Sequence, residues 1–173
     1  DLTTLGKGIA NGYPLSAVVG KKEIMKEMGE IFFSGTFGGE LLSLAAADTI
    51  LEMHISNSLV PKLSKIGGAI AQKTEELIQS CNLSDVLKLR GHDSWKILIW
   101  SDSNNYSTSA IKTLFLQEMF ANGVLIIGSH NVSAAITSKD ISKINSAYER
   151  TFSVISDCLS KGNLEEKLKV PPL

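Results

Sequence analysis

The alternation of strand-like and helix-like segments after residue 82 is the pattern that most constrains the fold. Four short apolar runs have the length and composition of strands: residues 86–91, 95–100, 124–129 and 131–136. Residues 104–123 and 137–161 have the apolar period of helices, with Ser or Thr at their starts and glycines at their ends. We therefore expect a compact α/β unit of three or four strands and two helices in this part of the chain.

The residues before this unit predict a different mixture of elements. Residues 15–20 are expected to form a short buried strand, and residues 21–28 a brief amphipathic helix. Three glycines break any periodicity in 31–40, which predicts a loop. Residues 40–54 predict a helix that is apolar around most of its circumference, and such helices are usually buried between other elements.

A long helix is predicted over residues 58–81, with its apolar side chains on one face. Gly67 and Gly68 interrupt this helix and mark either a weak point or a place where another backbone comes close. We place a domain boundary here, with residues 1–57 as the end of one domain and 58–173 as a second domain.

Composition narrows the classes of function. The 173 residues carry a net charge of −1, so we expect no nucleic-acid partner. No apolar run approaches the roughly 20 residues that a membrane span requires. The two cysteines lie far apart, and His54 and His92 have no partners at zinc spacing, so no metal site is expected. Two such separated cysteines suit a reducing compartment, and we expect a cytoplasmic protein.

Lys7 is the residue with the strongest candidate chemistry. It lies between Gly6 and Gly8, but the segment fits neither a Walker A loop nor a dinucleotide fingerprint, because the further glycines that these motifs need are missing. A lysine that forms a Schiff base must be deprotonated, partly buried and approached closely by a flat cofactor. Flanking glycines permit that approach, although a solvated lysine in a glycine turn also fits the residues alone.

The segment "DLTTLGKGIANGYPLSAVVGKKEIM" resembles the active-site lysine segment of the class III pyridoxal-phosphate aminotransferases. Within that class it is most similar to the glutamate-1-semialdehyde 2,1-aminomutase branch. The family pattern of Asp, Gly-Lys, Gly-x-Pro and a strand ending in glycine is matched by these residues: Asp1, Gly6, Lys7, Gly12, Pro14 and Gly20. The resemblance implies pyridoxal 5′-phosphate as cofactor and Lys7 as the catalytic, Schiff-base lysine.

Two later stretches are similar to the same branch. "FFSGTFGGELLSLAAADTIL" resembles the family's glycine-threonine loop, which implies that Gly35 and Thr36 bind the cofactor phosphate of the neighbouring subunit in a homodimer. "ANGVLIIGSHNVSAAITSKDISKINSAY" resembles the small C-terminal domain. The implied fold is α/β of the aspartate-aminotransferase type (fold type I), with residues 1–57 ending the large cofactor-binding domain and 58–173 forming the small domain.

The chain also departs from the aminomutase pattern. It has no acidic residue between Gly128 and Lys139, where we expect a glutamate-containing insert in aminomutases. The two arginines, Arg90 and Arg150, are not evident clamps for a substrate carboxylate. His130 lies in a predicted loop, where bonding a carbonyl is favoured over facing an active site.

The resemblance implies a transaminase that moves an amino group from an amino donor to a carbonyl acceptor, both of them small molecules, through a lysine internal aldimine. Two alternatives stay open. One is an aminomutase that moves the amine within a single molecule, and the other is a non-catalytic relative that serves as a dimer or interaction subunit.

Overall fold

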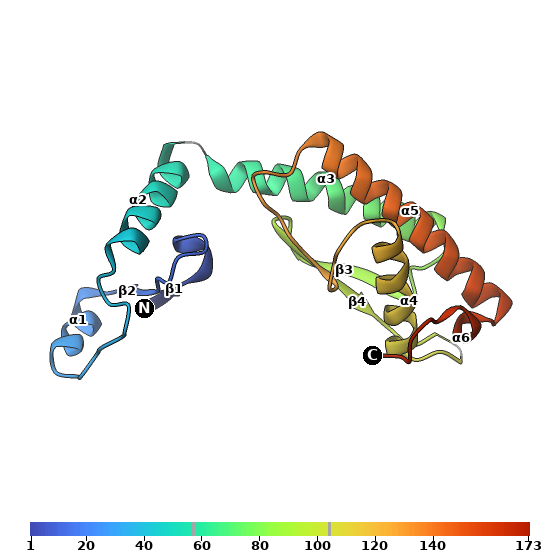
Figure 1. The fold of residues 1–173 in the computed structure, drawn as a ribbon, viewed down its shortest axis with the longest axis horizontal. Coiled ribbons are helices and arrows are strands. Elements are labelled where there is room, and N and C mark those ends of the chain that lie inside the picture. Colours follow the sequence, from blue (N-terminus) through green and yellow to red (C-terminus); the bar gives the residue numbers. More distant parts are fainter. Residues whose placement is uncertain (57, 104) are drawn as a thin grey trace. The chain divides into compact units, whose positions relative to one another are not determined.

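The structure is a computed structural model that describes residues 1–56, 58–103 and 105–173. It divides into two compact units, Asp1–Leu59 (unit 1) and Val60–Leu173 (unit 2) (Figure 1). Asn57, where the predicted boundary was drawn, and Asn104, in the segment that predicts a helix start, lie outside the described residues.

Unit 1 begins with an antiparallel pair of strands, β1 (Leu2–Leu5) and β2 (Ala17–Gly20). An ion pair of 2.6 Å between the Lys21 ammonium and the Asp1 carboxylate lies beside the first rung of this ladder. The remaining short elements of unit 1 are η1 (Lys7–Ile9), α1 (Lys22–Met25) and η2 (Lys26–Gly29). The predicted strand and brief helix are both found, although the second turn of the helix is of the 3-10 type. The expected burial of the strand is wrong, since none of its residues is buried.

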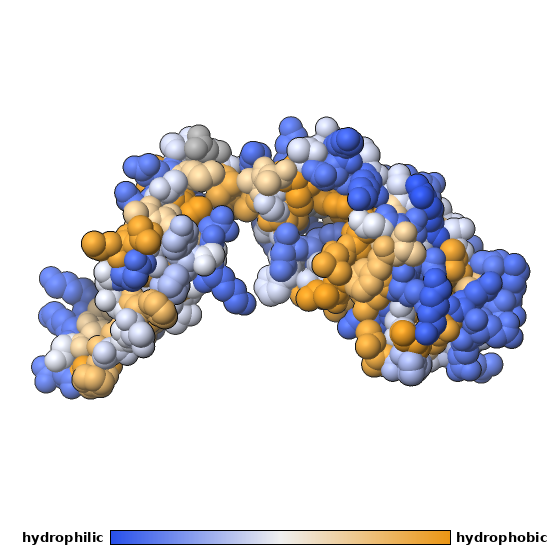
Figure 2. All heavy atoms as spheres, viewed as in Figure 1, coloured by the Kyte–Doolittle hydropathy of each residue, from blue (hydrophilic) through white to orange (hydrophobic). Residues whose placement is uncertain are grey.

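Helix α2 (Leu41–Ser56) is the long helix of unit 1, and most of it is exposed. Ser43 and Ala47 are its buried residues, whereas the Leu41 and Ile55 side chains are 77% and 86% exposed. The expected burial of this helix is therefore not found within unit 1. The physical reason is a lack of packing partners, because Ala10 is the remaining buried hydrophobic residue among the described residues of this unit. Figure 2 shows apolar side chains on the surface of the molecule.

Unit 2 contains a three-stranded antiparallel sheet in the order β3-β4-β5. Its strands are β3 (Leu87–His92), β4 (Trp95–Trp100) and β5 (Ser129–Asn131). The predictions of β3 and β4 are confirmed, but the two strands predicted over 124–129 and 131–136 are wrong. Of the residues in these two runs, Ser129 and Asn131 belong to β5, which pairs with β4. Gly128, directly before β5, turns the backbone with a φ of +104° and so ends the run over 124–127.

Four helices complete unit 2: α3 (Leu59–Ser80), α4 (Thr108–Ala121), α5 (Ser138–Lys161) and α6 (Leu164–Lys167). The Ser107 hydroxyl accepts a hydrogen bond from the first turn of α4, and Thr137 forms a capping box with Asp140 at the start of α5. Gly162 ends α5 in the left-handed conformation. The three long helices are confirmed, whereas the single turn of α6 was not predicted.

One apolar core joins the sheet and the helices of unit 2. Leu87, Leu89 and Leu98 are buried, and the register of β3 against β4 places them on one face of the sheet. They belong to the same cluster as buried side chains of α3, α4 and α5, so the helices cover that face. Phe115 and Tyr148 lie at the centre, fully buried and with their rings stacked at 5.9 Å.

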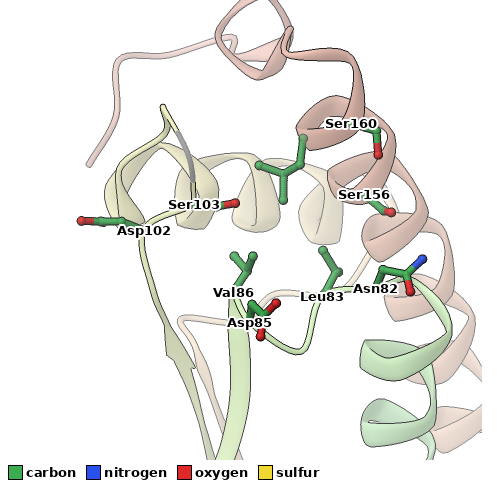
Figure 3. Close-up of a pocket in the computed structure, with 9 residues that line it drawn as sticks. Asn82, Leu83, Asp85, Val86, Asp102, Ser103, Ser156 and Ser160 are labelled. Atoms are coloured by element: carbon green, nitrogen blue, oxygen red, sulfur yellow. The ribbon is translucent and has the colours of Figure 1, made fainter.

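A polar cavity of about 400 Å³ opens beside this core, between the end of α3 and α5 (Figure 3). Both apolar and polar side chains line it: Asn82, Leu83, Asp85, Val86, Asp102, Ser103, Ser156, Leu159 and Ser160. The Asp102 carboxylate points away from the other lining side chains and accepts hydrogen bonds from the Thr108 backbone and hydroxyl at the start of α4. Among the described residues, no helix is both long and apolar enough to cross a membrane.

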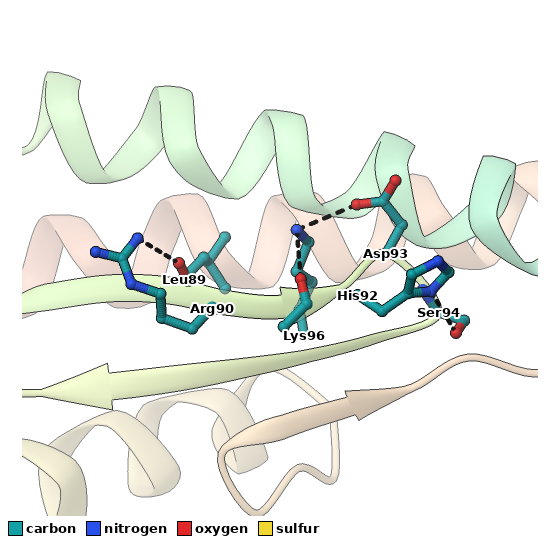
Figure 4. Close-up of polar contacts among 7 residues, drawn as sticks. Leu89, Arg90, His92, Asp93, Ser94 and Lys96 are labelled. Atoms are coloured by element: carbon teal, nitrogen blue, oxygen red, sulfur yellow. Dashed lines mark hydrogen bonds and ion pairs between the residues drawn. The ribbon is translucent and has the colours of Figure 1, made fainter.

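The turn between β3 and β4 packs directly against α3. The Lys96 ammonium binds the Asp93 carboxylate at 3.1 Å and the Gly91 carbonyl at 3.1 Å, which holds the turn in shape (Figure 4). A Cβ built on Gly67 would overlap the carbonyl oxygen of Asp93, whereas one on Gly68 would meet only the Asp93 carboxylate at 3.6 Å. Of the two readings of this glycine pair, the close approach of another backbone is therefore the observed one at Gly67.

We predict that Gly67→Ala destabilises unit 2 by about 1–3 kcal/mol, because the turn must move to admit the methyl group. Gly68→Ala is the matched control and should be stabilising by up to about 1 kcal/mol, since alanine favours the helix and has room. Both tryptophans lie in unit 2, so urea unfolding followed by tryptophan fluorescence reports on this unit. Equal stabilities of the two variants would contradict the prediction.

Candidate active site

Lys7 lies in a strained turn that follows β1. Its φ is +49°, in the left-handed region that a residue with a side chain seldom adopts, at a cost of about 1–3 kcal/mol. Hydrogen bonds from Ile9 N to Gly6 O at 3.3 Å and from Asn11 N to the Lys7 carbonyl at 3.2 Å hold the turn. Residues kept in such conformations cluster at functional sites. Asn11 in the same turn also has a positive φ, of +44°, so the backbone marks the turn as a whole and not Lys7 alone.

The space around the turn is open. A Cβ built on Gly6 or on Gly8 would meet no atom within 4 Å, so the described residues leave the approach to the Lys7 backbone free on both sides. The Lys7 side chain is exposed, so the expected partial burial is not found within unit 1. The reason is again that unit 1 buries few residues of its own.

Gly35 and Thr36 lie in the loop that leads into α2, and they line a cavity of about 570 Å³. The cavity is formed within unit 1 by two segments of the chain: Pro14, Leu15 and Ser16, and Phe33, Gly35, Thr36, Phe37, Gly38 and Gly39. The structure thus brings the glycine-threonine loop beside residues 14–16 of the lysine segment. Lys7 itself does not line the cavity, although η1 contacts α2.

Glu40 joins this loop to α2 and was not singled out by the sequence. Its carboxylate accepts hydrogen bonds from Leu42 N at 2.9 Å, from Ser43 N at 2.7 Å and from the Ser43 hydroxyl at 2.6 Å. These bonds, with the Ser43 hydroxyl bond the strongest, hold the pKa of Glu40 below its usual value. The available signal was an acidic residue directly before an apolar helix, with a serine three positions later.

The pyridoxal-type site that the resemblance implies can be tested against these residues. A flat ring needs an amine with open space beside it, which Lys7 and its flanking glycines supply. A phosphate needs hydroxyl and backbone N–H donors in a hollow, which the loop at Thr36 supplies. The residues of unit 1 therefore fit the group.

His130 differs from its prediction in both position and partner. It lies on β5 and is half-buried, and its Nε2 is 2.5 Å from the hydroxyl of the fully buried Tyr148. The expected bond to a carbonyl is therefore wrong. Burial lowers the pKa of His130 to about 4 and raises that of Tyr148, so both groups are neutral near pH 7.

The other candidate side chains of unit 2 have structural contacts. Arg150 donates to the Asn122 side chain at 3.3 Å, and Arg90 lies on β3 with a long contact of 3.4 Å to the Leu89 carbonyl. Trp100 packs against Phe115 with ring centroids 5.0 Å apart, whereas Trp95 is 57% exposed.

Comparison with known proteins decides the family. The sequence profile of the family described as "Aminotransferase class-III" matches residues 1–152, which is most of the chain. The chain belongs to the class III aminotransferase family. The resemblance on which the sequence analysis rested is thereby confirmed.

Two relatives carry the same name. The chain is 30% identical over 161 residues to a glutamate-1-semialdehyde 2,1-aminomutase of Methanosarcina acetivorans, covering 86% of this chain and 38% of that protein. It is 27% identical over 171 residues to glutamate-1-semialdehyde 2,1-aminomutase 2 of Anoxybacillus flavithermus, covering 92% and 39%. This class III chain therefore spans about two fifths of the length of these relatives.

The fold agrees with the family. The FumI protein of Sphingopyxis sp. MTA144, solved in its PLP internal aldimine form, is similar with a TM-score of 0.81 and 27% identity, covering 92% of this chain and 38% of that one. The class III chain has the α/β fold of type I transaminases, as expected.

The half-buried His130 makes the stability of unit 2 depend on pH. Its ordinary pKa of 6.5 applies to the unfolded chain and about 4 to the folded one, so the unfolded state binds the proton first. We predict that the free energy of unfolding falls by about 1–3 kcal/mol as the pH falls from about 6.5 to about 4.

The matched variant is His130→Gln, which can still bond the Tyr148 hydroxyl but cannot titrate. Urea unfolding at several pH values, followed by tryptophan fluorescence, should show a smaller fall for this variant over the same window. An identical fall in both proteins would mean that His130 does not carry the effect.

Proposed function

We propose that this chain is part of a pyridoxal 5′-phosphate-dependent aminotransferase that transfers an amino group from an amino donor to a carbonyl acceptor. The observation that carries the proposal is the turn at Lys7, where a lysine with a left-handed backbone is flanked by open space at Gly6 and Gly8. Membership of class III and the likeness to FumI, whose solved form contains the cofactor, support it.

When bound, the cofactor supplies an aldehyde that captures an amine and a ring that accepts electrons. The proposed roles of this chain are to hold it and to move a proton. Lys7 would hold the group through its Nζ. Once free, the same Nζ would move a proton at the α-carbon of the amino donor, first as a general base and then as a general acid.

This chemistry requires an unprotonated amine shielded from water. Because Lys7 is exposed within unit 1, the proposed enclosure has to come from outside this unit. The coverage of two fifths of the relatives' length leaves room for such a contribution. Residues 1–57 are accordingly proposed as the end of a large cofactor-binding domain and 58–173 as the small domain.

The loop at Gly35 and Thr36 is the proposed phosphate site. The Thr36 hydroxyl and the backbone N–H groups of Gly35 and Gly39 are suitable donors for a phosphate dianion, and these residues line the hollow. In the proposed homodimer this loop serves the cofactor of the neighbouring subunit. We further propose a cytoplasmic location for the enzyme.

An aminomutase is the second candidate, because the relative that is 30% identical to this chain carries that name. Such an enzyme moves the amine within one molecule and needs no separate acceptor. The segment between Gly128 and Lys139, which lacks an acidic residue, favours the transaminase.

We predict that full-length wild-type protein develops a visible absorbance band with pyridoxal 5′-phosphate and that Lys7→Ala does not. After borohydride reduction, peptide mass spectrometry should find the cofactor on Lys7. Lys22→Ala, which removes another exposed lysine of unit 1, is the control and should behave as wild type. A band of wild-type intensity in Lys7→Ala would refute the assignment, and no band in the wild type would favour the non-catalytic relative.

The two candidate activities give different products. We predict that the full-length holoenzyme forms no 5-aminolevulinate from glutamate-1-semialdehyde without an amino acceptor, yet converts its cofactor to the aminated form when an amino donor is added. Spectral titration with single amino donors and an assay for 5-aminolevulinate measure these outcomes. Acceptor-independent formation of 5-aminolevulinate would establish the aminomutase instead.

A further inference from the structure

Glu40 connects the cavity loop to α2 through a closed set of hydrogen bonds. Both of its carboxylate oxygens accept bonds from the first turn of α2, and the Ser43 that donates two of these bonds is fully buried. Its own backbone N–H donates to the Phe37 carbonyl at 3.2 Å, and its carbonyl accepts from Leu44 N at 3.1 Å. Glu40 is thus bonded to the loop on one side and to the helix on the other.

This arrangement occupies two of the N–H donors at the start of α2. The free N–H groups of a first helical turn form an anion site in many proteins. Here the N–H groups of Leu42 and Ser43 are occupied by Glu40, which also brings a negative charge to this position. An anion in the cavity therefore has to bind the loop residues that line it, among them Thr36.

The loop itself depends on how its end is held. Gly38 N donates to the Gly35 carbonyl at 3.0 Å, and Gly39 has a φ of +77°. A segment with three glycines in five residues has much conformational freedom to lose on folding. The hydrogen bonds of Glu40 hold the C-terminal end of this loop in place, which reduces its conformational freedom before an anion binds.

We propose that Glu40 is a positioning residue for the phosphate of the cofactor: by capping α2 it orders the loop of residues 35–39 and keeps anions off the helix. The proposal rests on the proposed function, because it takes the bound anion to be the phosphate of pyridoxal 5′-phosphate. Glu40 does not line the cavity, so it acts through the loop and not by contact.

The test compares two ligands that differ only in the phosphate, pyridoxal 5′-phosphate and pyridoxal. Full-length apoprotein is titrated with each, and binding is followed by visible absorbance and by tryptophan fluorescence. The variants are Glu40→Ala, which removes both acceptor oxygens, and Glu40→Gln, which keeps one. Glu52→Ala removes an exposed carboxylate from the same helix and is the matched control.

Glu40→Ala should bind pyridoxal 5′-phosphate about five- to tenfold more weakly and Glu40→Gln about two- to threefold more weakly, while both bind pyridoxal within about twofold of wild type. Glu52→Ala should match wild type with both ligands. Equal losses for the two ligands would show a merely structural role and overturn the proposal, as would undiminished binding of the phosphate form. If Glu40→Ala does not fold, Glu40→Gln carries the same comparison. Failure of the wild type to bind either ligand would instead refute the proposed function.

Discussion

Burial of one apolar face by three helices and a sheet is the constraint on which unit 2 depends. Each of α3, α4 and α5 contributes side chains to a core that also contains the inner face of β3 and β4. The aromatic rings of Phe115, Tyr148 and Phe152 fill its centre, and all three are fully buried. Loss of any one helix would expose the others, so the elements of this unit are stable only together.

Unit 1 is held together differently, by hydrogen bonds and turns more than by the burial of apolar side chains. It buries Ala10, Ser43 and Ala47 among its described residues, yet it keeps Lys7 in an unfavourable conformation and a glycine-rich loop in a defined one. Such features persist when surrounding structure holds them. The turn of Lys7 and the cap of Glu40 are accordingly the parts of unit 1 that are already ordered, so binding a ligand there would cost little further conformational entropy.

Sequence predicted well wherever a local rule decides the structure. The three long helices of unit 2 were recognised because their apolar period is long and their ends carry capping residues such as Thr137 and Gly162. The family also emerged, since the segment around Lys7 combines several specific residues at fixed spacing. The apolar run at 124–128 misled the strand prediction, because Leu125 and Ile127 are exposed and unpaired with β4, and alternation alone does not report pairing.

Other outcomes depended on contacts that one sequence does not encode locally. The partner of His130 is a tyrosine 18 residues away, which only the packing of β5 against α5 brings close. The exposure of α2 reflects how little of unit 1 surrounds it, although its composition is that of a buried helix. The role of Glu40 was hidden because a carboxylate before a helix is common on protein surfaces.

The close contact between Gly67 and the Asp93 carbonyl also sets the position of α3 along the sheet. Sliding the helix by one turn would bring Leu63 or Ala71 to the place where the Asp93 carbonyl touches the helix backbone. Either side chain would collide with the hairpin, so a shift of the helix by one turn is excluded in both directions. The absence of a side chain at Gly67 thus fixes the position of α3 along its own axis relative to the sheet.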